Sequence, residues 1–157
     1  MTRDALEDAV RTYAAGLEAE LTLLGQLQRL ATAQREATNT NELDRMTKIG
    51  EERERVLASL VAIEHEIRSI RTLLADTREQ VAALDGFARV VALHRTAGSL
   101  VQAIVSSDEE TMQALREAEL ARRLTAAAIE LGDNTLAAYR RVIAPPLTAA
   151  SLLDRHG

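Results

Sequence analysis

The side chains best able to bind a metal or move a proton are three histidines, His65, His94 and His156. They are far apart in the sequence, and only His65 has adjacent acids, because Glu64 and Glu66 flank it. A di-iron bundle uses two Glu-x-x-His repeats with two further glutamates, and a zinc protease uses His-Glu-x-x-His. Neither motif occurs in the sequence. The pattern predicts solvated histidines on helix faces and no metal site.

Motifs for nucleophilic catalysis and phosphate binding are also missing. The glycines stand singly, so no glycine-rich loop can surround a phosphate. The serines have no accompanying His and Asp arrangement that would activate a nucleophile. The chain has no cysteine, which excludes disulfides and thiolate metal sites. We therefore expect a protein that is not an enzyme and that uses no cofactor.

The composition is that of a folded chain with a narrow core. Hydrophobic residues make up 46% and charged residues 27%, but aromatic residues only 2%. Leu, Ala, Val and Ile suit thin seams between helices, whereas deep ligand pockets use aromatic bulk. The net charge is −5, and acids are interleaved with the arginines of residues 51–55. Without a basic face, we expect no nucleic-acid binding.

The sequence predicts a soluble, cytoplasmic protein. Its first residues, 1–4, lead directly into a charged helix and contain no apolar signal core. The apolar runs elsewhere are short, and none approaches the ~18 residues that a membrane-spanning helix needs. We therefore expect no membrane insertion.

Apolar residues recur every three or four positions from the start of the chain, which predicts a helix over residues 2–37. Residues 38–41, Thr-Asn-Thr-Asn, favour turns and caps because their side chains bond the nearby backbone. Asn41 is expected to be the N-cap of the next helix. The apolar positions of the first helix are Leu6, Val10, Tyr13, Leu17, Leu21, Leu24 and Leu27.

A heptad repeat predicts a second helix over residues 42–84 that forms a coiled-coil-like seam. Arg53 and Thr77 occupy the two steps of the repeat that are not apolar, so Arg53 either extends to water or pairs with an acid across the hairpin. Gly86 is a candidate C-cap, with the next helix beginning at Phe87. The apolar steps are Leu43, Met46, Ile49, Val56, Leu60, Ile63, Ile67, Ile70, Leu74, Val81 and Leu84.

A third apolar region follows. Ser107 with Glu110 three positions later is a capping box. It predicts a bend or break near residues 106–108, between helices over 87–105 and 108–143.

These elements together predict an all-α fold with a single helical domain over residues 1–144. Short loops make consecutive helices antiparallel neighbours, so the first two helices form a long antiparallel hairpin. The third helical region packs along that hairpin. Beyond Pro145 and Pro146, which remove backbone donors, we expect residues 145–157 to form a flexible C-terminal tail.

The helix between Ala118 and Ala138 carries small apolar residues on more than one face. Two interpretations stay open: it packs against both arms of the hairpin, or one face stays open for the amphipathic helix of a partner. The candidate partner-binding residues are Leu120, Leu124, Ala127, Ala128, Leu131, Leu136 and Tyr139.

Three stretches resemble the FlgN-type flagellar export chaperones. The first comprises residues 41–46 and 51–60, and the second residues 100–108 leading to Leu115. The third is the end of the chain, with Ala-Ala-Tyr-Arg-Arg at 137–141, two prolines and Asp-Arg-His-Gly at 154–157. Together they follow the order of the family over most of the chain.

The resemblance implies a small acidic chaperone that escorts hook-associated proteins to the flagellar type III secretion gate. Such a chaperone binds the disordered terminal helices of its cargo mainly through its C-terminal helix and prevents premature assembly. Tyr139 matches a C-terminal tyrosine implicated in docking at the export gate. The heptad repeat supports a different alternative, a structural coiled-coil or adaptor protein that self-associates into a homo-oligomer.

Overall fold

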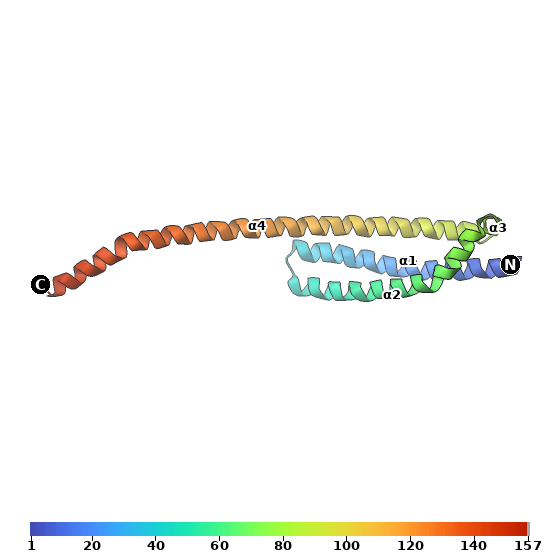
Figure 1. Ribbon diagram of the computed structural model, residues 1–157, viewed down its shortest axis with the longest axis horizontal. Coiled ribbons are helices and arrows are strands. Elements are labelled where there is room, and N and C mark those ends of the chain that lie inside the picture. Colours follow the sequence, from blue (N-terminus) through green and yellow to red (C-terminus); the bar gives the residue numbers. More distant parts are fainter. Residues whose placement is uncertain (157) are drawn as a thin grey trace. The chain divides into compact units, whose positions relative to one another are not determined.

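A computed structural model describes the backbone of residues 1–156 and the side chains of residues 1–141 (Figure 1). Every regular element in that part is an α-helix, which confirms the all-α prediction. None of these helices is both long enough and apolar enough to cross a membrane. The chain divides into two compact units, Met1–Ala114 and Leu115–Gly157, whereas the sequence predicts one domain over residues 1–144.

The first unit is built on an antiparallel pair of helices, α1 (Arg3–Asn39) and α2 (Leu43–Asp76) (Figure 1). Thr2 is the N-cap of α1, and its hydroxyl accepts a hydrogen bond from the backbone N–H of Ala5 at 3.2 Å. This bond satisfies one of the amide donors that a helix N-terminus leaves without a partner. The predicted hairpin is therefore present, and its first helix is slightly longer than the expected 2–37.

The turn between α1 and α2 uses Asn41 differently from the prediction. Asn41 has φ 56°, the left-handed conformation that Asn tolerates better than most residues. Its N–H bonds the carbonyl of Thr38 at 3.2 Å, and the N–H of Glu42 bonds that of Ala37 at 2.9 Å. These bonds form a Schellman motif that ends α1. The N-cap of α2 is Glu42, not Asn41, and its side chain makes no capping hydrogen bond.

The predicted helix over residues 42–84 is divided in two. α2 ends at Asp76, and the short α3 (Arg78–Ala82) follows Thr77. The Thr77 hydroxyl donates to the carbonyl of Leu73 at 2.8 Å, and its φ and ψ of −112° and 27° leave the helical range. The seam continues across this break, because Val81 and Leu84 are both buried.

The third helix, α4 (Phe87–His156), is continuous, so the two separate helices expected over residues 87–105 and 108–143 are not found. The other expectation, a bend near residues 106–108, stays a prediction. Ser107 is buried within the helix, and its carbonyl accepts a hydrogen bond from the Thr111 hydroxyl at 3.0 Å. A capping box requires a helix N-terminus at Ser107. Packing of Ser107 and Thr111 in the first unit keeps the helix intact there, and helices over 87–105 and 108–143 are replaced by one.

In the first unit, α4 runs parallel to α1 and antiparallel to α2 (Figure 1). Tyr13 of α1 contacts His94, and Arg35, further along α1, contacts Glu110. The three helices enclose two apolar clusters. One comprises Leu6, Val10, Tyr13, Ala14, Leu17, Ile67, Leu74, Val81, Leu84 and Val90, and the other Leu24, Leu27, Ala31 and Ile104.

The last part of α4 extends beyond the predicted helix end at residue 143 and through Pro145 and Pro146 to His156. Each proline lacks one backbone donor and its ring crowds the carbonyl four residues earlier, but its fixed φ of about −65° is a helical value. The helix thus continues past residue 143, where the sequence predicts that it ends. The expected flexibility of residues 145–157 stays a prediction, and Gly157 lies outside the described residues.

Candidate partner-binding surface

The seven candidate residues all lie on α4 in the second unit, and all are exposed. Leu131 is the most exposed of the leucines, at 70%, and Leu124 is 64% exposed. Among the described residues from 115 to 141, no side chain is buried. Within the second unit, the seven side chains are therefore open to solvent.

Six of the seven candidates share one side of the helix. At 3.6 residues per turn, each residue is rotated by about 100°, which brings the six within about a third of the helix circumference. Leu136 lies further round, beside the equally exposed Ile129, which the sequence-based list omits. We call the six the apolar stripe: Leu120, Leu124, Ala127, Ala128, Leu131 and Tyr139.

The charged residues of this segment lie mainly on the opposite side of the helix. Glu119 accepts hydrogen bonds from Arg122 at 2.8 and 2.9 Å and from Arg123 at 3.0 Å. These bonds lower the pKa of Glu119 to about 2, with Arg122 as the largest contributor. The segment is therefore amphipathic. Such a helix can pack its apolar side against the apolar side of another helix.

A polar network joins the three helices inside the first unit. Its members are Tyr13 and Glu20 on α1, Glu64 and Arg71 on α2, and His94 on α4. Arg71 donates through Nε to the Tyr13 hydroxyl at 2.9 Å, and its two terminal nitrogens bind both oxygens of Glu64. The Tyr13 hydroxyl then lies 2.9 Å from Nε2 of His94. Since Arg71 uses an acceptor position of that hydroxyl, the tyrosine is free to donate to the histidine.

The electrostatics of this network follow from burial and from Arg71. Burial first, and then the hydrogen bond to Glu64, raise the pKa of Glu20 to about 7, which favours its protonated form. Arg71 and Glu20 lower the pKa of Glu64 to about 2, so Glu64 keeps the negative charge. Burial and then the charge of Arg71 lower the pKa of His94, which favours a neutral ring. The polar groups of this network hydrogen-bond to one another, which is typical of a network that joins helices and stabilises the fold.

A second polar junction joins the same helices near the α1–α2 turn. Arg53 forms a bidentate pair with Asp108, at 2.7 and 2.8 Å, and donates to Gln34 at 2.6 Å. The sequence predicts that Arg53 pairs across the hairpin or extends to water. It does pair with an acid, but that acid lies on α4, and the partner across the hairpin is the Gln34 amide.

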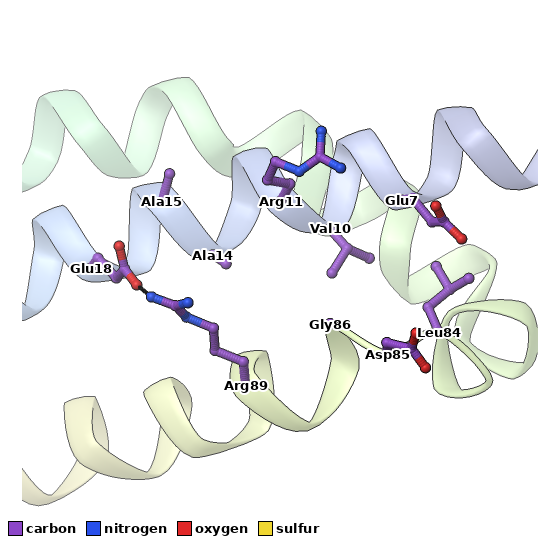
Figure 2. Close-up of a pocket in the computed structure, with 10 residues that line it drawn as sticks. All are labelled: Glu7, Val10, Arg11, Ala14, Ala15, Glu18, Leu84, Asp85, Gly86 and Arg89. Atoms are coloured by element: carbon purple, nitrogen blue, oxygen red, sulfur yellow. Dashed lines mark hydrogen bonds and ion pairs between the residues drawn. The ribbon is translucent and has the colours of Figure 1, made fainter.

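A hollow in the first unit lies between α1 and the start of α4 (Figure 2). Its volume is about 410 Å³, with Val10 and Leu84 among its apolar lining residues. Arg89 crosses it to form an ion pair with Glu18, as the dashed line in Figure 2 shows. Gly86 permits the close approach, because a Cβ there would lie 3.0 Å from a methyl of Val10. The hollow is thus a helix junction with charges at its edge.

Two further exposed apolar groups were not among the predicted site residues. Leu57 and Val61 on α2 are 46% and 69% exposed, and Val101, Val105 and Met112 on α4 are about half exposed. In the sequence, Val101, Val105 and Met112 all belong to the apolar pattern of the third region. The sequence cannot separate positions that face the hairpin from positions that face solvent, because the two kinds alternate within one drifting stripe.

No group of three or more His, Cys, Asp or Glu side chains that could hold a metal occurs among the described residues. His65 and His94 lie on different helices, and the side chain of His156 lies outside the described part. A scan against protein-family models and searches of curated proteins and of solved structures find no match to this chain.

Proposed function

We propose that this protein is a cytoplasmic export chaperone of the FlgN kind, which binds the amphipathic terminal helices of flagellar hook-associated proteins. The observation that carries the proposal is the exposed apolar stripe on α4. It provides three leucines, each more than half exposed, along a helical segment in which no described side chain is buried. The resemblance to that family, over residues 41–46, 51–60, 100–108, 137–141 and 154–157 and the two prolines, supplies the identity of the cargo.

A surface of this kind suits a carrier that must release what it binds. Leucine and alanine offer apolar contact without the deep aromatic pockets that give very tight binding. At a rise of 1.5 Å per residue, residues 115–141 extend over about 40 Å, enough for several turns of a partner helix. While the turns of the partner helix lie on the stripe, they cannot pack against other subunits in the assembled filament. Tyr139, 62% exposed, is the proposed contact with the export gate.

Self-association as a structural coiled coil is the alternative function. It depends on the heptad repeat of residues 43–84, and most of that repeat faces the inside of the first unit. Ile49, Ile67, Leu74, Val81 and Leu84 are buried there, whereas Leu43 is exposed. The seam is therefore used within the chain, which leaves the alternative without its main support. Light scattering tests it directly, because a stable high-order oligomer that cargo does not alter would favour self-association.

The proposal is tested by titrating the purified protein with terminal segments of hook-associated proteins from the same organism. Leu124→Asp and Leu131→Asp place a charge in the stripe at positions that are exposed in the free protein. Each should weaken binding by about 2 kcal/mol or roughly 30-fold, since an apolar contact is lost and a carboxylate is desolvated. Surface substitutions usually change stability by no more than about 0.5 kcal/mol.

Ala126→Asp is the matched control, because Ala126 is exposed and lies on the charged side of the same helix. It should leave cargo binding unchanged. Failure of the unaltered protein to bind any intact terminal segment would refute the proposed function. If the two leucine variants instead unfold the first unit, the stripe belongs to a core and cannot be the binding surface.

A further inference from the structure

The charges that border the apolar stripe are asymmetric. One edge carries three arginines, Arg116, Arg123 and Arg141. Two acids, Glu119 and Glu130, lie beside them, and Glu117 lies at the N-terminal end of the stripe itself. The other edge carries no charge over the same length. Its residues are Ala121, Thr125, Gly132 and Leu136.

All three edge arginines are exposed. Arg123 is held by Glu119 at 3.0 Å, and its side chain is still 74% exposed. Arg116 and Arg141 form no ion pair with the described side chains. The positive edge is therefore only partly neutralised within the chain, and it remains accessible to a helix that lies on the stripe.

The charges of a second copy of this helix would not complement the arginines of this edge. When two identical helices pack antiparallel, like edges face each other, so the arginines of one copy would meet those of the other. When they pack parallel, opposite edges face each other, and the arginines would meet the uncharged edge. The first arrangement is repulsive and the second leaves the arginines without partners.

We propose that the occupant of the stripe is an amphipathic helix with acidic residues along one border of its apolar face. The acids would lie against Arg116, Arg123 and Arg141, whose positions along the axis are separated by about 10 Å and about 27 Å. This inference rests on the proposed function and adds the chemistry by which the cargo is selected. Exposed ion pairs contribute little affinity each, so the edge acts mainly on the choice of partner and its orientation.

Two synthetic helical peptides test the inference. They share one leucine and alanine face, and their border positions carry glutamate in one peptide and lysine in the other. Binding to the full-length protein is measured by fluorescence anisotropy at low and at physiological salt. The glutamate peptide should bind at least about 10-fold more tightly at low salt. The ratio should fall as salt rises, because exposed charges are screened.

The chain offers a closely matched pair of variants. The edge variant is Arg123→Glu with Arg141→Glu, and the control is Arg122→Glu with Arg140→Glu. Both change the net charge equally, and both disturb a hydrogen bond to Glu119, since Arg122 and Arg123 each donate to it. The control arginines lie away from the stripe. The edge variant should reverse the preference for the glutamate peptide, whereas the control should retain it.

Several outcomes separate this inference from the proposed function. If hook-associated segments bind but the glutamate and lysine peptides bind alike, the inference is refuted and the proposed function stands. If the edge and control variants behave identically toward a bound cargo segment, the inference is also refuted. If neither cargo segments nor peptides bind, both proposals are refuted. A dimer that is formed through the stripe and excludes the peptides would identify a second copy as the occupant and overturn the inference.

Discussion

A single added methyl group at Gly16 should show how closely α1 and α2 approach each other. A Cβ at this position would lie 2.5 Å from Cγ2 of Ile67. Ile67 is 4% exposed and belongs to the larger apolar cluster, so its side chain has little room to move. Gly16→Ala must therefore separate the helices locally or force Ile67 into a strained rotamer.

The expected magnitude is the difference between two effects. Overpacking of a well-filled core costs about 1–3 kcal/mol, and the contact distance of 2.5 Å favours the upper half of that range. Replacing glycine with alanine within a helix recovers about 1 kcal/mol of helix propensity. Gly16→Ala should thus lower the free energy of unfolding by about 1–2 kcal/mol. Gly98→Ala should raise it by about 1 kcal/mol, because a Cβ at Gly98 meets nothing within 4 Å.

The assay is denaturant unfolding of proteins that also carry Tyr139→Phe, followed by the fluorescence of Tyr13 and by circular dichroism. Tyr13 is 3% exposed in the first unit, so its signal reports the packing of that unit. Ile67→Leu removes the branched methyl that meets the new Cβ, and alone it should cost less than about 1.5 kcal/mol. In the double variant, the effect of Gly16→Ala should shrink, which gives a favourable coupling of about 1 kcal/mol.

Equal changes in unfolding free energy for Gly16→Ala and Gly98→Ala would refute the close approach of the two helices at this point. A double variant whose effects simply add would show that Ile67 is not the residue in the way. Both results would also contradict the register of α1 against α2, because that register places Gly16 beside Ile67.

Two polar contacts give further predictions. Glu20 has a pKa raised to about 7 from 4.5, so its stabilising contribution is full below pH 4.5 and is lost as pH rises through 7. Glu20→Gln should equal the unaltered protein near pH 4 and exceed its unfolding free energy near pH 8, by up to roughly 3 kcal/mol, measured by denaturant titration. Arg53→Met should cost about 2 kcal/mol, because it leaves Asp108 without its bidentate partner. Arg35→Met breaks the more exposed pair with Glu110 and should cost less than about 1 kcal/mol in the same assay.

The sequence predicts the hairpin well because its signals are local and repeated. Spacings of three and four residues recur from Leu6 to Leu27, and the run of Thr and Asn at 38–41 interrupts them. The turn lies where that run predicts. The predicted N-cap role of Asn41 was wrong. Asn can occupy either the N-cap of a helix or the left-handed position just after a helix end, and Asn41 takes the second.

The boundaries that fail depend on contacts between distant residues. Ser107 and Glu110 have the spacing of a capping box, but Ser107 and Thr111 are buried in the first unit and the helix continues. Thr77 occupies an apolar step of the heptad, yet its hydroxyl binds the carbonyl of Leu73 and the helix stops. At both places the local sequence is compatible with a continuous helix and with an interrupted one, and tertiary packing decides between the two.

The polar network of Tyr13, Glu20, Glu64, Arg71 and His94 could not be predicted from spacing. Tyr13 and His94 are 81 positions apart, and their contact requires that α4 lie beside α1 in one register. Glu20 is only 9% exposed, although glutamates are mostly exposed in proteins. Residue types suggest the capacity for hydrogen bonds, but only the arrangement of three helices brings these groups together.

Exposure of the apolar stripe links the proposed partner binding to the stability of the helix itself. In the described segment 115–141 no side chain is buried, and a helix without tertiary packing is marginally stable in water. Covering Leu120, Leu124 and Leu131 would supply the missing apolar burial, so partner binding and helix formation are linked. Part of the interaction energy then orders the helix and lowers the net affinity. A long contact surface with modest affinity is what a carrier that must later release its cargo requires.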